Sequence, residues 1–192
     1  AKDAREEALS EAEVNEVQSL DGVWIIDREI GVFDEACLTE VCGSSFVGFR
    51  IDEELVGIGG KTVVGRTPDI SGQFTITGSE IISTEGGDRP TVTVDMTTLV
   101  TDDASRNNAI KRQAIETSQF PEASLVITQP IDFSSATDLE AGFTTEIVGD
   151  VTIHGVTQEE LIEVTASFDG SRILVYGNLG PILLSDYEIE KP

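Results

Sequence analysis

From Leu20 onward, apolar and polar residues alternate in short runs, and this two-residue period is typical of β-strands with one buried face. The run at 45–52, for example, puts Val47, Phe49 and Ile51 on one face and only polar residues and glycine between them. Glycine-rich turns separate the runs, as at Gly59-Gly60. Such spacing predicts an all-β domain of about eight or nine strands, an antiparallel sandwich or barrel. The predicted strands lie at 23–27, 45–52, 69–77, 81–82, 91–96, 125–127, 147–153, 161–168 and 173–179.

One internal segment departs from this period. Residues 107–116 carry apolar side chains at helical spacing, and Phe120-Pro121 ends the run. Asp102, Asp103 and Ser105 precede it and are suitable N-cap residues. We therefore expect a short helix inserted between two strands, lying across one end of a barrel.

The first residues have a different composition. Residues 1–19 are rich in alanine and glutamate and contain no glycine, proline or aromatic residue. Helix propensity is high here, but the apolar stripe is thin. We therefore divide the chain into a helical or disordered stalk or leader at 1–19 and a β domain at 20–192.

The charge of the chain restricts its partners. Twelve lysines and arginines face 36 aspartates and glutamates, giving a formal net charge of −24. Such a surface repels phosphate backbones and anionic headgroups, which argues against nucleic-acid binding and electrostatic membrane docking. Solubility is the simplest role of this acidity.

Two observations bear on where the protein acts. The sequence begins at Ala1 and its only methionine is Met96, so we expect a processed or trimmed product, with a membrane tether through a removed N-terminal segment as one option. Cys37 and Cys42 have four residues between them, which suits a small loop-closing disulfide and therefore an exported protein that is periplasmic, secreted or on the cell surface. Two buried thiols are the alternative.

Motifs for catalysis and metal binding are weak. Gly59-Gly60-Lys61-Thr62 resembles part of a phosphate loop, but Leu55 stands where the pattern needs glycine. The chain has no Gly-x-Ser-x-Gly, and its single histidine, His154, lies beside a glycine in a predicted turn. We therefore predict no enzyme, no catalytic residue, no metal site and no catalytic cofactor, and keep a His154-dependent hydrolase as the third hypothesis.

The interior of the predicted barrel is a candidate ligand site. Gly72 and Gly149 fall on the inward phase, where the lack of a side chain leaves room. A dry void binds apolar chains, because each buried methylene contributes about 0.8 kcal/mol. The alternative is that these glycines only relieve strain in a solid core.

Several motifs in order resemble one family. They are the opening strand at 20–27, Ser45-x-Val47-x-Phe49-x-Ile51, Ile70-x-Gly72-x-Phe74, the run from Val92 to Thr101, the segment Arg106 to Arg112 with Phe120-Pro121, and Gly149 to Thr157. The chain resembles the YceI-like lipid- or polyisoprenoid-binding proteins from about Leu20 to its C-terminus. It departs from them at Asn107, where the family usually has Asp, and in longer segments around the two cysteines and at 57–68.

The resemblance implies a lipocalin-like antiparallel barrel that encloses an isoprenoid, an isoprenoid quinone or another lipid, without catalysis. On strand phase we predict that apolar side chains line the cavity, with Leu99 and Ile110 capping one end. Arg106 and Arg112 are candidates for the headgroup, because guanidinium groups hold phosphate or quinone oxygens well. The alternative is that both arginines pair with nearby carboxylates. The predicted lining residues are Val47, Phe49, Ile51, Ile70, Phe74, Val92, Val94, Leu99, Ile110, Leu125, Ile127, Val151 and Ile153.

The alternative hypothesis is an extracellular β-barrel interaction module. It would act through its outer surface without a bound lipid, and a contiguous exposed apolar patch would favour it. The oligomeric state stays open, with a dimer among the options.

Overall fold

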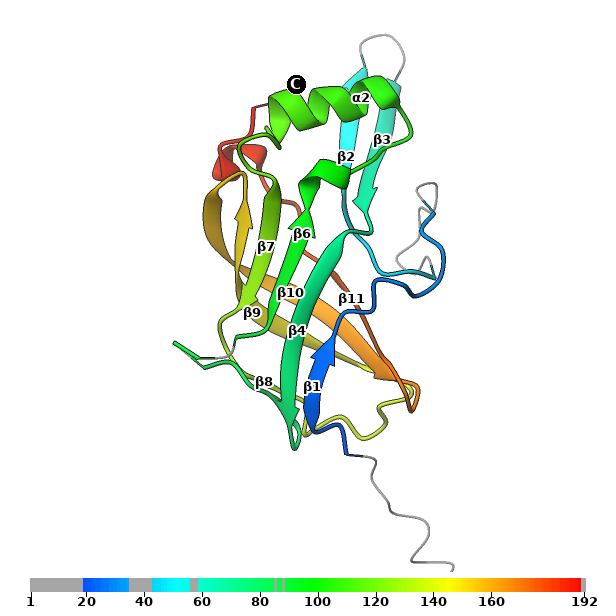
Figure 1. Cartoon of the computed structure of the whole chain (residues 1–192), viewed down its shortest axis with the longest axis vertical. Helices are drawn as coiled ribbons and strands as arrows, with labels where there is room; N and C mark the ends of the chain where they lie inside the picture. The colour runs from blue at the N-terminus through cyan, green and yellow to red at the C-terminus, as the bar shows by residue number, and fades with distance from the viewer. Residues whose placement is uncertain (1–18, 35–42, 56–58, 85, 88, 191–192) are drawn as a thin grey trace, which may run out of the picture.

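A computed structural model describes residues 19–34, 43–55, 59–84, 86–87 and 89–190 (Figure 1). Residues 1–18 of the predicted stalk at 1–19 and both cysteines, Cys37 and Cys42, lie outside the described residues. Within the described part of the chain, no helix is long and apolar enough to cross a membrane.

Antiparallel strands dominate the structure, as the two-residue period predicted. The strands are β1 (Gly22–Ile25), β2 (Val47–Leu55), β3 (Gly59–Thr67), β4 (Ile70–Thr77), β5 (Glu80–Ile81), β6 (Thr91–Asp95), β7 (Glu122–Ile127), β8 (Ile131–Asp132), β9 (Phe143–Ile153), β10 (Val156–Phe168) and β11 (Ile173–Asn178). The helices are η1 (Met96–Thr98), α2 (Ala104–Ala109), η2 (Ile110–Ala114) and η3 (Leu184–Tyr187).

The strands form one large sheet and one hairpin. The order in the large sheet is β11-β10-β9-β7-β6-β4-β5-β8, and β1 pairs with β4 on its other side. Only Pro68 and Asp69 separate β3 from β4, and a bridge joins Arg66 on β3 to Val100, which follows η1. The hairpin β2–β3 therefore continues from this sheet. Proline lacks a backbone N–H, which explains why the ladder is interrupted at this bend.

The sheet curls so that its two edges approach each other through side chains. Trp24 on β1 meets Phe168 on β10 edge-to-face, with ring centroids 6.0 Å apart. The ladders described do not join β1 to β11, so the edge strands β1, β2 and β11 each pair on one side only. The prediction of an all-β, lipocalin-like antiparallel barrel is confirmed.

The helical segment crosses the upper end of the barrel in Figure 1, as predicted. It begins at Ala104, three residues before the predicted start, because the side chain of Asp103 accepts a hydrogen bond from the backbone N–H of Arg106 and caps the helix there. η2 follows without a break, and its Ile110 and Ala114 are buried.

Two strands, β3 and β8, and two short helices, η1 and η3, were missed in the sequence. β3 lies in a segment rich in glycine and cations that lacks a clear period, and β8 has only two residues. η3 follows the last strand and carries Tyr187, a fully buried residue. β8 and η3 form through contacts with segments distant in sequence, β5 and β10, whereas β3 forms by hairpin pairing with β2.

Two apolar clusters fill the barrel. The upper cluster lies below the helix and is built around ten buried residues: Leu99, Ile110, Ala114, Ile115, Ile131, Ile147, Val151, Ile162, Tyr187 and Ile189. The lower cluster contains Leu20, Ile76, Phe133 and Phe168, with Trp24 and Phe74 packed against it. Ile81 contacts both clusters, so the core is continuous from end to end.

Candidate functional site

The residues predicted to line a cavity face the inside of the barrel. Most belong to or pack against one of the two clusters: Phe49, Leu99, Ile110, Leu125, Ile127, Val151 and Ile153 in the upper cluster and Phe74 in the lower one. Ile70 and Val94 are buried and opposite each other, and Val92, opposite Leu125, is half-buried. Their role in holding a ligand stays a prediction.

Inward-facing side chains on the edge strands of the barrel are more exposed to solvent than those in the two clusters. Val47 and Ile51 on β2 are each 37% exposed, although they share a face with Phe49, which packs against the upper cluster. Val175 on β11 is opposite Ala166, on the face of β10 that carries Phe168, and is 53% exposed. The apolar inner surface of the barrel is therefore open to solvent at its edge strands.

The two inward glycines do not leave the void that we expected. A Cβ atom on Gly149 would lie 2.6 Å from the side chain of Leu125, and one on Gly72 would lie 3.0 Å from the side chain of Ile26. Neighbouring side chains thus occupy the space beside both glycines. The expectation of a void at these positions was wrong, because each glycine accommodates a residue from an adjacent segment.

Three segments at the end of the barrel opposite the helix in Figure 1 surround an apolar cavity. We call it the base cavity. It measures about 350 Å³, and its walls come from the residues before β1, the turn between β4 and β5, and the loop after β8. The lining residues are Ser19, Leu20, Gly78, Ser79, Phe133, Ser134, Ala136 and Leu139.

The base cavity adjoins the lower cluster directly. Leu20 and Phe133 are members of that cluster, and Ala136 and Leu139 pack against it. A volume of this size falls within the range of small-molecule sites in proteins. The sequence analysis missed these residues, because they come from three turns that carry no strand period.

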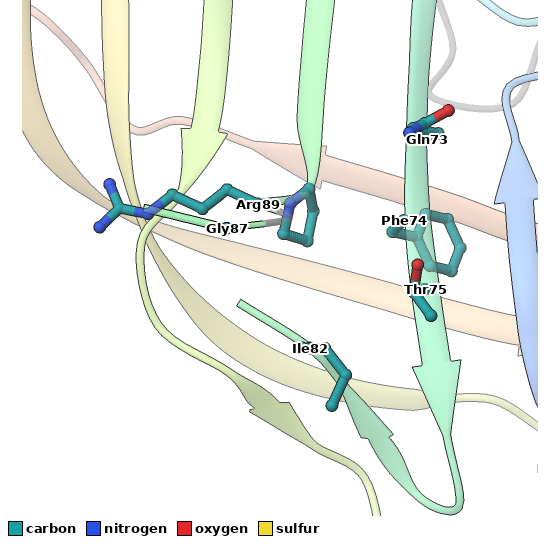
Figure 2. A pocket seen from close by; sticks show the side chains of 7 residues that line it. Gln73, Phe74, Thr75, Ile82, Gly87 and Arg89 are labelled. Carbon is teal, nitrogen blue, oxygen red and sulfur yellow. The ribbon is translucent and has the colours of Figure 1, made fainter. Parts of the chain in front are cut away.

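A second, smaller cavity of about 180 Å³ lies beside β4 (Figure 2). Figure 2 shows Gln73, Phe74 and Thr75 along β4 and Arg89 extending away from them. The Nε atom of Arg89 is buried and has no hydrogen-bond partner among the described residues. The other residues that line this second cavity are Ile82, Gly87 and Pro90. Polar groups make up much of the cavity wall, so an apolar chain would fit there poorly.

The predicted headgroup arginines lie on the helix, at the end of the barrel far from the base cavity. Arg106 forms an ion pair with Asp102 one helical turn earlier, and Lys61 binds the same carboxylate at 3.0 Å. Arg112 is exposed. The two side chains therefore sit at the helical end of the barrel, and their headgroup role stays a prediction.

His154 holds three segments together near the helix. Its Nε2 lies 3.0 Å from a carboxylate oxygen of Glu116, its Nδ1 lies 3.2 Å from the carbonyl oxygen of Tyr187, and its ring lies against Phe120. Both partners are acceptors, so only a doubly protonated ring can donate to both at once. Neither ring nitrogen bonds a serine in the described residues, and this geometry indicates a structural tie.

The backbone is unusual around His154. Glu116, His154 and Glu188 are the non-glycine residues with positive φ in the described chain, at 51°, 53° and 54°. Such a left-handed conformation costs about 1–3 kcal/mol for a residue other than glycine. The three strained positions end the helical segment, form the β9–β10 turn and end η3, so contacts among these segments hold the strain.

A buried polar pair lies close by. The hydroxyl of Tyr187, a residue with no exposed surface, donates to Glu160 at 3.0 Å. Burial, followed by the hydrogen bond and the charge of Glu160, raises the pKa of Tyr187 well above its usual value. Glu160 lies on the same face of β10 as Ile162 and therefore points into the barrel. Strand phase alone predicts an apolar side chain at this inward position, but the structure has a carboxylate there.

Comparison with known proteins agrees with this architecture. A family model described as the YceI-like domain matches residues 42–191. Among solved structures, a polyisoprenoid binding domain from Saccharophagus degradans, described as implicated in plant cell wall breakdown, is similar with a TM-score of 0.56 and 17% identity over 76% of each chain. BcnA from Burkholderia cenocepacia has a TM-score of 0.53 and 16% identity over 74% of this chain and 80% of its own.

At these identities the solved structures establish the fold alone. Among curated proteins, none matches this sequence.

Proposed function

Because the chain belongs to the YceI-like domain family, we propose that it is a non-enzymatic protein that binds a lipid or another apolar, chain-like molecule. The observation that carries the proposal is the base cavity, an apolar space of about 350 Å³ at one end of the barrel whose walls include residues of the lower cluster. Transfer of each methylene from water into such a space contributes about 0.8 kcal/mol. A single alkyl or isoprenyl chain end would thus bind without any charged contact.

The isoprenoid class is the finer part of this proposal. It is supported by the resemblance of the sequence motifs and by the fold shared with a polyisoprenoid binding domain. The volume of the base cavity accommodates only part of a long isoprenoid. The remainder would extend into the barrel by displacing side chains of the lower cluster, or lie along the partly exposed inner face of β11 at Val175.

The proposal is tested by filling the base cavity. In Ala136→Trp, an indole replaces a methyl group in the cavity wall, whereas Ala141→Trp places the same side chain at an exposed position of the same loop. Each protein is purified from the native host, its fold is checked by circular dichroism, and organic extracts are analysed by mass spectrometry. We expect a lipid in the wild type and in Ala141→Trp, and at least tenfold less in Ala136→Trp.

Two results would overturn the proposal. One is equal lipid content in the two tryptophan variants, which would show that the base cavity is not the site. The other is a wild-type protein that carries no lipid from its host and takes up no added alkyl or isoprenyl probe.

A further inference from the structure

The described segments that line the base cavity carry charge of one sign only. We propose that this cavity selects amphiphiles with a cationic headgroup and discriminates against the same chain with an anionic headgroup. This inference rests on the proposed function, since it concerns the headgroup of the molecule whose chain enters the base cavity.

The segments that form the cavity contain five carboxylates and no lysine, arginine or histidine. They are residues 19–21, 78–81 and 131–141, and the carboxylates are Asp21, Glu80, Asp132, Asp138 and Glu140. Four of the five are exposed and Glu80 is half-buried. A headgroup that remains in water at this mouth would therefore meet negative charge from every wall.

Hydrogen bonds hold three of these carboxylates at the rim. Asp21 accepts from the hydroxyl of Ser19 at 2.8 Å and from the backbone N–H of Gly78, both of which line the cavity. Asp132 accepts from the backbone N–H of Ser134, a third lining residue, at 2.8 Å. Asp138 accepts from the backbone of Glu140 and Ala141, next to the lining residue Leu139.

The same bonds keep two of these carboxylates ionised. The hydrogen bond from Gly78 lowers the pKa of Asp21, and the bonds from Ser134 lower that of Asp132. Both groups therefore stay negative at neutral and mildly acidic pH. The rim is a fixed set of charges that a ligand does not need to reorganise.

The opposite end of the barrel carries charges of both signs. Lys61, Arg106, Lys111 and Arg112 gather on and beside the helix, where Asp102 binds two of them. The segments that line the base cavity thus lack the cations that the helical end supplies. A headgroup at the base would meet none of these cations in the described structure.

The expected preference is modest because the rim is exposed to water. Two or three exposed charge contacts correspond to about a tenfold change in affinity at low ionic strength. Salt at about 0.15 M should reduce the preference, because the Debye length is then about 8 Å.

The experiment compares three probes with the same twelve-carbon chain, dodecyltrimethylammonium, dodecyl glucoside and laurate. Binding is measured by calorimetry below the micellar concentration of each probe, at low and at physiological salt. We expect the cationic probe to bind the wild type about tenfold more tightly than laurate, with the uncharged probe between them.

Two double variants separate the rim from the general charge of the protein. Asp132→Asn with Asp138→Asn removes two rim charges and retains the oxygen that accepts each backbone hydrogen bond. Glu122→Gln with Glu159→Gln removes two exposed charges near the other end of the barrel and serves as the matched control. The difference between the cationic and anionic probes should fall to about twofold in the first variant and stay near tenfold in the second.

The outcomes separate the two proposals. Equal affinity of the three probes, or the same change in both double variants, overturns headgroup selection and leaves chain binding in place. If no probe binds, both headgroup selection and the proposed function are wrong.

Discussion

At the scale of single residues, His154 illustrates how a lone histidine acquires a structural role. Its two ring nitrogens contact Glu116 and the carbonyl of Tyr187, which belong to segments far apart in the sequence. Its side chain is only 10% exposed, so water replaces these contacts poorly when they are lost. The contacts tie the β9–β10 turn to the end of the helical segment and to η3.

We expect His154→Ala to lower the free energy of unfolding by about 1–3 kcal/mol, because buried hydrogen-bonding groups lose their partner. Asparagine tolerates the left-handed backbone at this position but lacks the imidazole ring. His154→Asn should therefore lower the free energy of unfolding by a similar amount, because it loses the ring contacts. Urea unfolding measures both variants, and lipid content should stay at the wild-type level. A loss of lipid without a loss of stability would instead indicate a functional role for the ring.

Tyr187 provides a prediction that depends on pH. Its folded-state pKa lies above the usual value of 10.0, so folding favours the neutral phenol. The resulting stability is complete below about pH 10 and is lost as the pH rises through and beyond that value. The wild type should therefore lose stability on going from about pH 8 to about pH 11.

Tyr187→Phe should reduce that alkaline loss. The variant should also cost about 1–3 kcal/mol at neutral pH, because Glu160 loses its donor. Tyr176→Phe is the control, since Tyr176 is 39% exposed. Urea unfolding at the two pH values would contradict the argument if Tyr187→Phe and the wild type lost stability in parallel.

At the scale of elements, the register of β7 on β9 shows why glycine stands at an inward position. Gly149 is opposite Ile127, and the pair beside it is Leu125 with Val151. The side chain of Leu125 covers Gly149, so the strands pack closely where a side chain would separate them.

Gly149→Ala should destabilise the fold by about 1–3 kcal/mol through overpacking. Its Cβ atom would lie 2.6 Å from Leu125 and 2.9 Å from the carbonyl oxygen of Val126, and the second contact is to backbone that cannot rotate away. Gly180→Ala is the matched control, because nothing lies within 4 Å of a Cβ atom there. Equal unfolding midpoints for the two variants would show that β7 and β9 separate easily.

At the scale of the whole molecule, a net charge of −24 on 192 residues opposes compaction. Exposed ion pairs compensate little of it, since Arg28–Asp69 and Lys61–Asp102 join well-exposed side chains. Fold stability must therefore come from the two apolar clusters, and self-repulsion should reduce it measurably.

We expect the thermal unfolding midpoint to rise as ionic strength increases from about 10 mM to about 150 mM, because the Debye length falls from about 30 Å to about 8 Å. Glu122→Gln with Glu159→Gln should raise the midpoint at low salt and have less effect at high salt. Calorimetry of the two proteins in sodium chloride checks both statements. A midpoint that is independent of salt would show that the charges are too widely spaced to repel one another.

Local patterns in the sequence were sufficient to predict most of the strands and the inserted helix, with Asp103 among its candidate caps. They also predicted that side chains such as Leu125 and Val151 face the inside of the barrel. These features depend on backbone geometry and on which face of an element is apolar, and both repeat over a few residues. The resemblance of several motifs in order was enough to recognise the YceI-like family. The same patterns could not identify β3, whose strand conformation depends on its pairing with β2.

The tertiary structure decided where space remains inside the barrel. Side chains of other segments fill the space beside Gly72 and Gly149, where voids were expected. The base cavity forms instead among three segments without a strand period, around Leu20, Ser79 and Phe133. It also decided the partners of His154 and the burial of Tyr187. A period in the sequence predicts which face of a strand a side chain is on. The distance from that side chain to its neighbours depends on how the sheet curls, and the curl is a property of the whole chain.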